Sequence, residues 1–215
     1  MTEFAAAREQ MVREQLRRRG VSDVAVLAAM GRVPRHEFVP AEYQELAYDD
    51  QPLPIGGGQT ISQPYVIALM LQHLRLSGGE KVLEIGAGSG YQAALLAELA
   101  SEVWTVERVG HLADRARERL ERLGYRTAHV VRGDGTKGLP SQAPFDGILI
   151  AAAAPGIPQP LIEQLAPGGR LVAPVGPRWT QSLIVATKTA TGLQQRDVCG
   201  VVFVPLIGEH GWTEE

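Results

Sequence analysis

Residues 81–91 read KVLEIGAGSGY, and this stretch decides the fold. A short β-rich run over 81–85 passes into a turn with three alternate glycines. A pattern typical of a helix then follows over residues 90–100. A strand, a glycine turn and a helix in this order are typical of an open α/β sheet. Such a sheet binds nucleotide-like ligands at the carboxyl ends of its strands.

The alternation continues from this stretch toward the C-terminus. We predict helices over 109–123 and 158–165, and the predicted strands are 102–107, 128–132, 145–150, 170–175, 181–187 and 193–204. Strands that alternate with helices form right-handed βαβ units and a parallel sheet. The last two strands are separated only by a turn near Thr191 and Gly192, which predicts an antiparallel pair at one edge. The fold class is therefore α/β, with a mostly parallel central sheet and an antiparallel edge pair.

Helical additions are expected on the N-terminal side of this core. Apolar spacing predicts a helix over 4–19 that ends at Gly20, and a second over 23–31 with Ser22 as its cap. Residues 45–64 carry three prolines and three consecutive glycines, so we predict a functional loop there. Pro64 fits the first turn of a further helix over 64–75. We expect one domain over 1–215, with additions and an active-site loop in 1–79 and the core in 80–215.

Composition excludes several classes of protein. The 215 residues carry a net charge of −3 and no basic stripe, which argues against nucleic acid as a partner. No apolar run is long enough to span a membrane, and no signal peptide is recognisable. Cys199 is the single cysteine and no histidine pair has metal-ligand spacing, so we expect no metal site and a cytoplasmic location. We expect the protein to be a monomer.

The glycine turn predicts which cofactor is bound. Tyr91 stands where a dinucleotide fingerprint has its third glycine, and Glu84 would repel a pyrophosphate. Glu84 is instead suited to a cationic amino group, directly or through water. Glu107 ends the next strand, where an acid accepts hydrogen bonds from both ribose hydroxyls. Asp134 after the third strand is suited to the adenine amino group.

These features indicate ribose and adenine without phosphate, which fits S-adenosylmethionine. Each acid also has a simpler interpretation: Glu84 as a helix-dipole partner, Glu107 as a surface acid beside Arg108, and Asp134 as a turn former. The full set of predicted cofactor residues is Gln59, Thr60, Glu84, Gly86, Ala87, Gly88, Ser89, Tyr91, Glu107, Arg108, Asp134 and Gly135.

From about residue 33 to residue 212 the chain resembles the protein-L-isoaspartate (D-aspartate) O-methyltransferases. GQTISQP at 58–64 is the motif most specific to that family. The other matching stretches are RHEFVP (35–40), AYDD (47–50), LPIG (53–56), VLEIG (82–86), YQ (91–92), GDG (133–135), PFD (144–146), QL (164–165), GG (168–169), PVG (174–176) and FVPL (203–206). Ala87 departs from the family, which often has Thr there, and residues 151–154 are all Ala where some members carry a Thr.

The resemblance implies a Rossmann-like methyltransferase fold and an enzyme that methylates isoaspartyl residues of damaged proteins and peptides, with S-adenosylhomocysteine as product. It assigns the active-site role to Ser62, which is alternatively only the cap of helix 64–75. Predicted substrate-binding residues are Pro54, Ile55, Gly56, Thr60, Ile61 and Ser62. Turn packing is the simpler role for 54–56, and an ST-turn for Thr60.

The chemistry of this reaction agrees with the lack of a general-base constellation in the sequence. A carboxylate acceptor has an ordinary pKa near 3.9 and is already ionised at neutral pH, so it needs no general base. The chain indeed shows no His/Asp or Cys/His constellation. Two alternatives stay open: a methyltransferase with another acceptor, and a non-catalytic S-adenosylmethionine-binding protein that recognises peptides.

Overall fold

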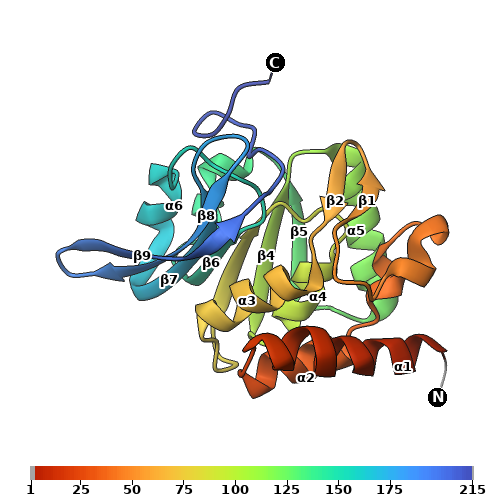
Figure 1. Ribbon diagram of the computed structural model, residues 1–215. Coiled ribbons are helices and arrows are strands. Elements are labelled where there is room, and N and C mark those ends of the chain that lie inside the picture. Colours follow the sequence, from red (N-terminus) through yellow and green to blue (C-terminus); the bar gives the residue numbers. More distant parts are fainter. Residues whose placement is uncertain (1–2, 215) are drawn as a thin grey trace.

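A computed structural model describes residues 3–214 as an α/β fold around a seven-stranded sheet (Figure 1). The strand order is β5-β4-β3-β6-β7-β8-β9. The strands are β3 (Lys81–Ile85), β4 (Glu102–Glu107), β5 (Ala128–Arg132), β6 (Phe145–Ile150), β7 (Leu165–Val175), β8 (Gln181–Thr189) and β9 (Gly192–Val201). The pairs from β5 to β7 are parallel, and β8 and β9 continue the sheet in antiparallel pairing. The predicted fold class is confirmed.

The bounds of β7, β8 and β9 differ from the prediction, and β8 extends to residue 189 rather than 187. β7 begins at residue 165 rather than 170, because the chain leaves α6 (Gln159–Gln164) directly into the sheet. β9 ends at residue 201 rather than 204. The following residues instead turn back across the sheet, where Pro205 bridges Ala153 and Ile207 bridges Trp212.

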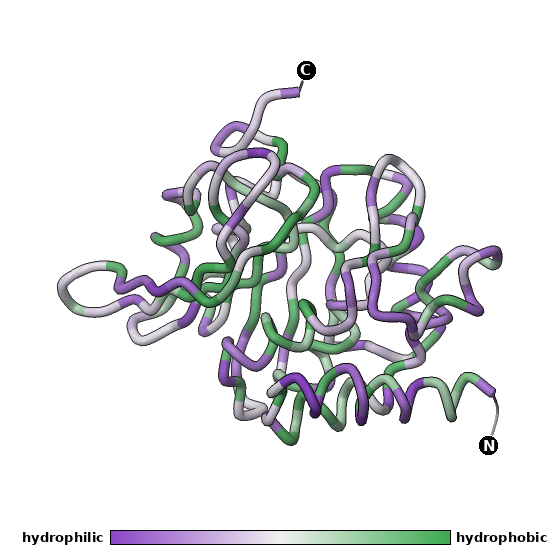
Figure 2. Tube along the Cα trace, in the orientation of Figure 1, coloured by the Kyte–Doolittle hydropathy of each residue, from purple (hydrophilic) through white to green (hydrophobic). Residues whose placement is uncertain are grey.

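Alternate residues of the strands enter two separate cores. Val82, Val103 and Leu149 pack with α3 (Pro64–Leu74), α4 (Tyr91–Ala97) and α5 (Gly110–Leu123) on one face of the sheet. Leu83, Ile85 and Ile148 face the other side and pack with α6 residues. Figure 2 shows that hydrophobic residues predominate along the central strands, and that hydrophilic residues are frequent on the N-terminal helix.

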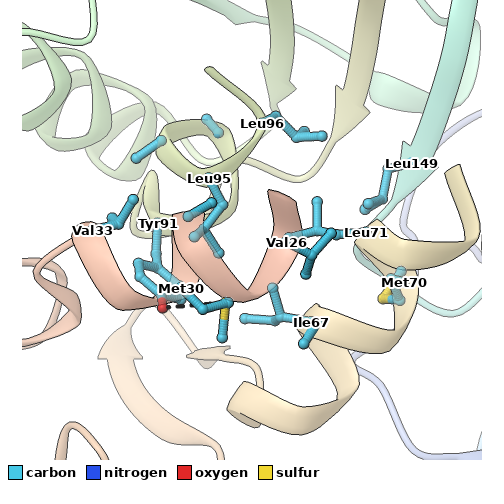
Figure 3. Packing of buried hydrophobic residues seen from close by; sticks show 14 of the residues in the cluster. Val26, Met30, Val33, Ile67, Met70, Leu71, Tyr91, Leu95, Leu96 and Leu149 are labelled. Atoms are coloured by element: carbon cyan, nitrogen blue, oxygen red, sulfur yellow. Dashed lines mark hydrogen bonds between the residues drawn. The ribbon is translucent and has the colours of Figure 1, made fainter. Parts of the chain in front are cut away.

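The N-terminal residues form a second layer over α3 and α4. α1 (Glu3–Gln10) continues through a π-helical segment (Met11–Leu16) and a 3-10 turn (Arg17–Arg19) to Gly20, whose φ of 93° ends the helix. α2 (Val24–Arg32) then packs between α3 and α4, with Val26 and Met30 buried among Ile67, Tyr91 and Leu95 (Figure 3). No helix of residues 3–214 is long and apolar enough to cross a membrane.

The cap of α2 is Asp23, and the prediction of Ser22 was wrong by one residue. The Asp23 carboxylate accepts hydrogen bonds from the backbone N–H groups of Ala25 and Val26, at 2.9 and 3.2 Å. Ser22 instead donates its backbone N–H to the Gln72 side chain at 2.8 Å. Asp23 rather than Ser22 caps α2 because its carboxylate reaches two otherwise unpaired N–H groups at the positive end of the helix.

Replacing Asp23 with Ala is therefore expected to lower the free energy of unfolding by about 1 kcal/mol, the usual loss for a helix cap. Urea denaturation followed by circular dichroism measures this change. Ser22→Ala is the matched control, and its effect is expected to be smaller. A larger loss in Ser22→Ala than in Asp23→Ala would reverse the assignment.

The segment 45–64, predicted as a loop, has regular structure. Two 3-10 helices (Arg35–Phe38 and Ala41–Leu46) lead to a hairpin of β1 (Leu53–Gly56) and β2 (Gln59–Ile61). Gly56, Gly57 and Gly58 all have positive φ, which explains the glycine run at the turn. β1 and β2 are too short to show a clear alternation of apolar and polar residues in the sequence, and Pro54 interrupts β1. This hairpin stands over the carboxyl ends of the central strands (Figure 1).

Candidate active site

A cleft lies at the carboxyl ends of β3, β4 and β6, where the strand order changes direction. The β2 end of the hairpin, the glycine turn and the C-terminal segment surround it. Its lining residues are Gln59, Thr60, Ile61, Ser62, Ile67, Ile85, Gly86, Ala87, Gly88, Ser89, Tyr91, Gln92, Val106, Glu107, Arg108, Val109, Gly135, Ala151, Ala152, Val204, Pro205, Leu206 and Ile207. Ten of the twelve predicted cofactor residues are in this set, and Glu84 and Asp134 are not.

The glycine turn forms the floor of the cleft. Gly86 and Gly88 have φ values of 94° and 51°, a region that other residues rarely adopt. A Cβ on Gly88 would lie 3.3 Å from the Ile55 side chain. The residues of this turn line the cleft, and the lack of side chains at 86 and 88 lets a ligand approach the backbone closely.

Glu107 faces the cleft from the end of β4. One carboxylate oxygen accepts the Gly88 N–H at 2.9 Å and the other accepts the Val109 N–H at 2.8 Å. Each oxygen keeps a lone pair for a further donor. Glu107 is only 6% exposed, so any hydrogen bond made to a ligand here is strong. The contact with two ribose hydroxyls stays a prediction.

Glu84 is fully buried behind the glycine turn and does not line the cleft. Its Oε2 accepts a hydrogen bond from Thr105 at 2.5 Å, and its Oε1 has no partner among the described residues. Burial raises the pKa of Glu84 to about 8, although the Thr105 hydroxyl opposes that rise. Of the two predicted contacts with an amino group, a direct one does not fit this placement. A contact made through water stays a prediction, for which the unpartnered Oε1 is the available atom.

The raised pKa of Glu84 makes stability depend on pH. Between pH 4.5, the ordinary value, and about 8 the unfolded chain loses the proton that the folded protein retains. Rising pH across this interval therefore favours the unfolded state. Glu84→Gln is expected to become progressively more stable relative to the unsubstituted protein over the same interval. Urea denaturation of both proteins near each end of the interval measures this, and a constant difference would contradict it.

Asp134 lies beside the cleft and acts as a turn former. Its carboxylate accepts hydrogen bonds from the N–H and hydroxyl of Thr136, at 2.9 and 2.7 Å, and from the Glu209 N–H at 2.9 Å. Hydrogen bonds from Glu209 and Thr136 lower the pKa of Asp134 although burial opposes them. The simpler interpretation is thus shown for this residue, which ties the C-terminal segment to β5. Contact with adenine stays a prediction.

Ser62 lines the cleft directly after β2. It is not the cap of α3, because Gln63 occupies the cap position and makes no side-chain capping bond. The alternative role considered for Ser62 is therefore excluded. Gln59, Thr60 and Ile61 line the same wall.

Three predicted substrate residues lie outside the cleft. Pro54 and Gly56 are exposed on β1, and Ile55 is buried beneath Gly88. Turn packing, the simpler role, explains Ile55. Pro54 pairs with Thr60 and Leu53 with Ile61, and of these pairs only the β2 residues line the cleft.

Residues 204–207 form a wall of the cleft that was not predicted as part of the site. Leu206 donates its N–H to the Ala153 carbonyl at 2.7 Å, and Trp212 donates its indole N–H to the same carbonyl at 3.1 Å. Arg108, which lines the cleft, forms an ion pair with Glu214. The FVPL motif at 203–206, which matches the family, is the sequence feature that could have indicated this wall.

Within residues 3–214, no group of His, Cys, Asp or Glu is placed to hold a metal.

The sheet order, the glycine turn without a phosphate cradle and the acid at the end of β4 together define an S-adenosylmethionine-dependent methyltransferase. The family model for protein-L-isoaspartate(D-aspartate) O-methyltransferase matches residues 6–211. The chain belongs to that family.

Similar proteins cover nearly the whole chain. The protein-L-isoaspartate O-methyltransferase of Methanoculleus marisnigri is 57% identical over 208 residues, which is 97% of this chain and 94% of that protein. A solved protein-L-isoaspartate O-methyltransferase superposes with a TM-score of 0.86 at 30% identity, over 95% of this chain and 67% of that one. A putative protein-L-isoaspartate O-methyltransferase from Plasmodium falciparum was solved in complex with S-adenosyl-L-homocysteine. It superposes with a TM-score of 0.81 at 27% identity, over 96% of this chain and 99% of that one.

Proposed function

We propose that this protein transfers the methyl group of S-adenosylmethionine to the free carboxylate of L-isoaspartyl residues in damaged proteins and peptides. Family membership and the bound product in the Plasmodium falciparum relative support both the cofactor and the acceptor. The observation that carries the proposal is the position of Ser62. It shares a cleft with the glycine turn and Glu107, and the lining residues found within 3–214 include no histidine, cysteine or lysine.

The residues present fit S-adenosylmethionine. Glu107 offers a free lone pair on each oxygen for the ribose hydroxyls, and the open backbone at Gly86 and Gly88 admits the amino-acid part. The unsatisfied Oε1 of Glu84 fits a bridging water near that amino group. Ala87, Ser89, Tyr91, Arg108 and Gly135 complete the proposed cofactor site, with Gln59 and Thr60 closing it from the hairpin; Asp134 stays a candidate for adenine.

When bound, S-adenosylmethionine supplies a methyl group on a cationic sulfur with a neutral thioether as leaving group. The acceptor carboxylate arrives ionised, so the chain has to orient it rather than deprotonate it. The Ser62 hydroxyl donates a hydrogen bond to one carboxylate oxygen and leaves the other free to attack. A neutral donor suits this step better than an arginine, because methylation removes the charge that an arginine would stabilise.

The acceptor wall is formed by residues 59–62, with Thr60, Ile61 and Ser62 beside the substrate. The acceptor wall is held in shape by the other strand of the hairpin, which contains Pro54, Ile55 and Gly56. Residues 204–207 and the glycine turn exclude water from the reacting groups.

We further propose a single methyltransferase domain that works as a monomer in the cytoplasm. It acts on isoaspartyl-containing proteins and peptides and accepts D-aspartyl residues as the family name implies. Nucleic acid and membrane are not proposed as partners, since the net charge is −3 and the chain has no basic stripe.

The acceptor class is tested with labelled S-adenosylmethionine and two peptides of one sequence that differ only in an aspartyl or an isoaspartyl linkage. Label on the isoaspartyl peptide supports the proposal. Label on a small-molecule or RNA acceptor panel instead would identify another methyltransferase. Binding of S-adenosylhomocysteine without transfer to any acceptor would identify the non-catalytic alternative.

A further inference from the structure

Arg35 is a fully buried arginine directly below the acceptor wall. Its side chain has no exposed surface, and it comes from the 3-10 helix Arg35–Phe38. Burial lowers the pKa of Arg35 to about 10, so the guanidinium stays charged at neutral pH. No carboxylate of residues 3–214 forms an ion pair with it. A buried charge without a counter-ion is costly, which suggests a role beyond filling space.

The guanidinium bridges two backbone carbonyls from separate segments. Nε donates to the carbonyl of Ala47 at 2.7 Å, and one terminal nitrogen donates to the carbonyl of Ser62 at 2.8 Å. Ala47 ends the second 3-10 helix, and Ser62 is the proposed acceptor-orienting residue. A rigid planar fork can hold two carbonyls at fixed relative positions, which a lysine ammonium cannot.

The same guanidinium lies over the ring of Tyr91, 5.0 Å from its centroid. Tyr91 begins α4 and lines the cofactor side of the cleft. Arg35 is therefore in contact with both halves of the site, the acceptor wall through Ser62 and the glycine turn through Tyr91.

Fixing the Ser62 carbonyl also fixes the peptide that follows it. In a trans peptide the C=O and N–H groups point in opposite directions. The carbonyl points down to Arg35, so the Gln63 N–H points away from it, and no described residue accepts a hydrogen bond from that N–H. With the carbonyl held, the backbone of Ser62, from which its hydroxyl side chain projects, is held in place.

We propose that Arg35 is a positioning residue for methyl transfer: it fixes the Ser62 backbone against Tyr91 so that the Ser62 hydroxyl meets the acceptor carboxylate. This inference rests on the proposed function of Ser62. It assigns to the buried guanidinium a part in the reaction that acts through another residue.

A double-mutant cycle between Arg35→Lys and Ser62→Ala tests the proposal. Arg35→Lys alone is expected to lower kcat/KM for an isoaspartyl peptide about tenfold, since Lys keeps the charge but cannot hold both carbonyls. In the Ser62→Ala background the same change is expected to cost less than about twofold, because the group it positions is gone. The dissociation constant of S-adenosylhomocysteine is expected to stay within about threefold throughout.

A merely structural role would give a different pattern. Equal fold-losses in both backgrounds, or a loss of product affinity equal to the loss of kcat/KM, would overturn the proposal. Arg35→Met, which removes both donors, is expected to reduce kcat/KM further than Arg35→Lys wherever it folds. If Arg35→Met does not fold, the cycle with Arg35→Lys decides alone.

Arg8→Lys is the matched control. Arg8 belongs to the same layer and contacts the hydroxyl of Tyr48 at 3.5 Å, but it makes no contact with Ser62. Its replacement is expected to leave kcat/KM within about twofold, with all assays run well below the thermal midpoints. A tenfold loss in Arg8→Lys would show that any change in this layer impairs turnover, which also overturns the proposal. Activity on isoaspartyl peptide in the unsubstituted protein separates failure here from failure of the proposed function.

Discussion

Glu107→Ala is expected to weaken binding of S-adenosylhomocysteine by about 100-fold. The carboxylate has one free lone pair on each oxygen, positioned for two ribose hydroxyls in a site that excludes water. Hydrogen bonds to a charged group contribute about 1.5 kcal/mol or more each, so losing two costs about 3 kcal/mol. That loss corresponds to about two orders of magnitude in the dissociation constant. Isothermal titration calorimetry measures it directly.

Glu102→Ala is the control for this change. Glu102 begins the same strand that Glu107 ends, and it does not line the cleft. Its replacement is expected to leave product affinity unchanged. If Glu107→Ala also bound S-adenosylhomocysteine within about threefold of the unsubstituted protein, the ribose assignment would be wrong.

Ser62→Ala is expected to lower kcat/KM for isoaspartyl peptide on the order of 100-fold while product affinity changes less than about threefold. The hydroxyl orients the acceptor and makes no proposed contact with the cofactor. Because the acceptor needs no base, orientation is the main contribution that a side chain can make. Steady-state kinetics combined with calorimetry separates the two effects.

Ser182→Ala on β8 is the control, since this serine lies outside the cleft. It is expected to leave both quantities unchanged. A loss of product affinity as large as the loss of kcat/KM in Ser62→Ala would place Ser62 in the cofactor site instead.

The periodic part of the fold was predictable from the sequence, and the hairpin was not. β3, β4, β5 and β6 have the predicted bounds, because buried strands and amphipathic helices have repeating apolar positions that a sequence displays. β1 and β2 have only four and three residues, interrupted by Pro54, and leave no such pattern. Their pairing depends on the glycine turn and on Leu53, Ile55 and Ile61 reaching the core.

The candidate site was predicted best where backbone geometry decides it. The glycines at 86 and 88 and the acid at the end of β4 follow from position along the chain, and the structure places them in the cleft. The roles of Asp134 and Glu84 were harder to predict, because their hydrogen-bond partners come from distant parts of the sequence. Glu209 of the C-terminal segment donates to Asp134, and Thr105 of the adjacent strand donates to Glu84. Arg35 likewise acquires its partners only through folding.

The central claim is that one carboxylate isomer is methylated at this cleft. The most direct test places aspartyl and isoaspartyl forms of one peptide in the same reaction with labelled S-adenosylmethionine and locates the methyl ester by mass spectrometry. We predict a base-labile ester on the isoaspartyl carboxylate and none on the aspartyl form. Methylation of both forms alike, or of neither while S-adenosylhomocysteine binds normally, would contradict the account.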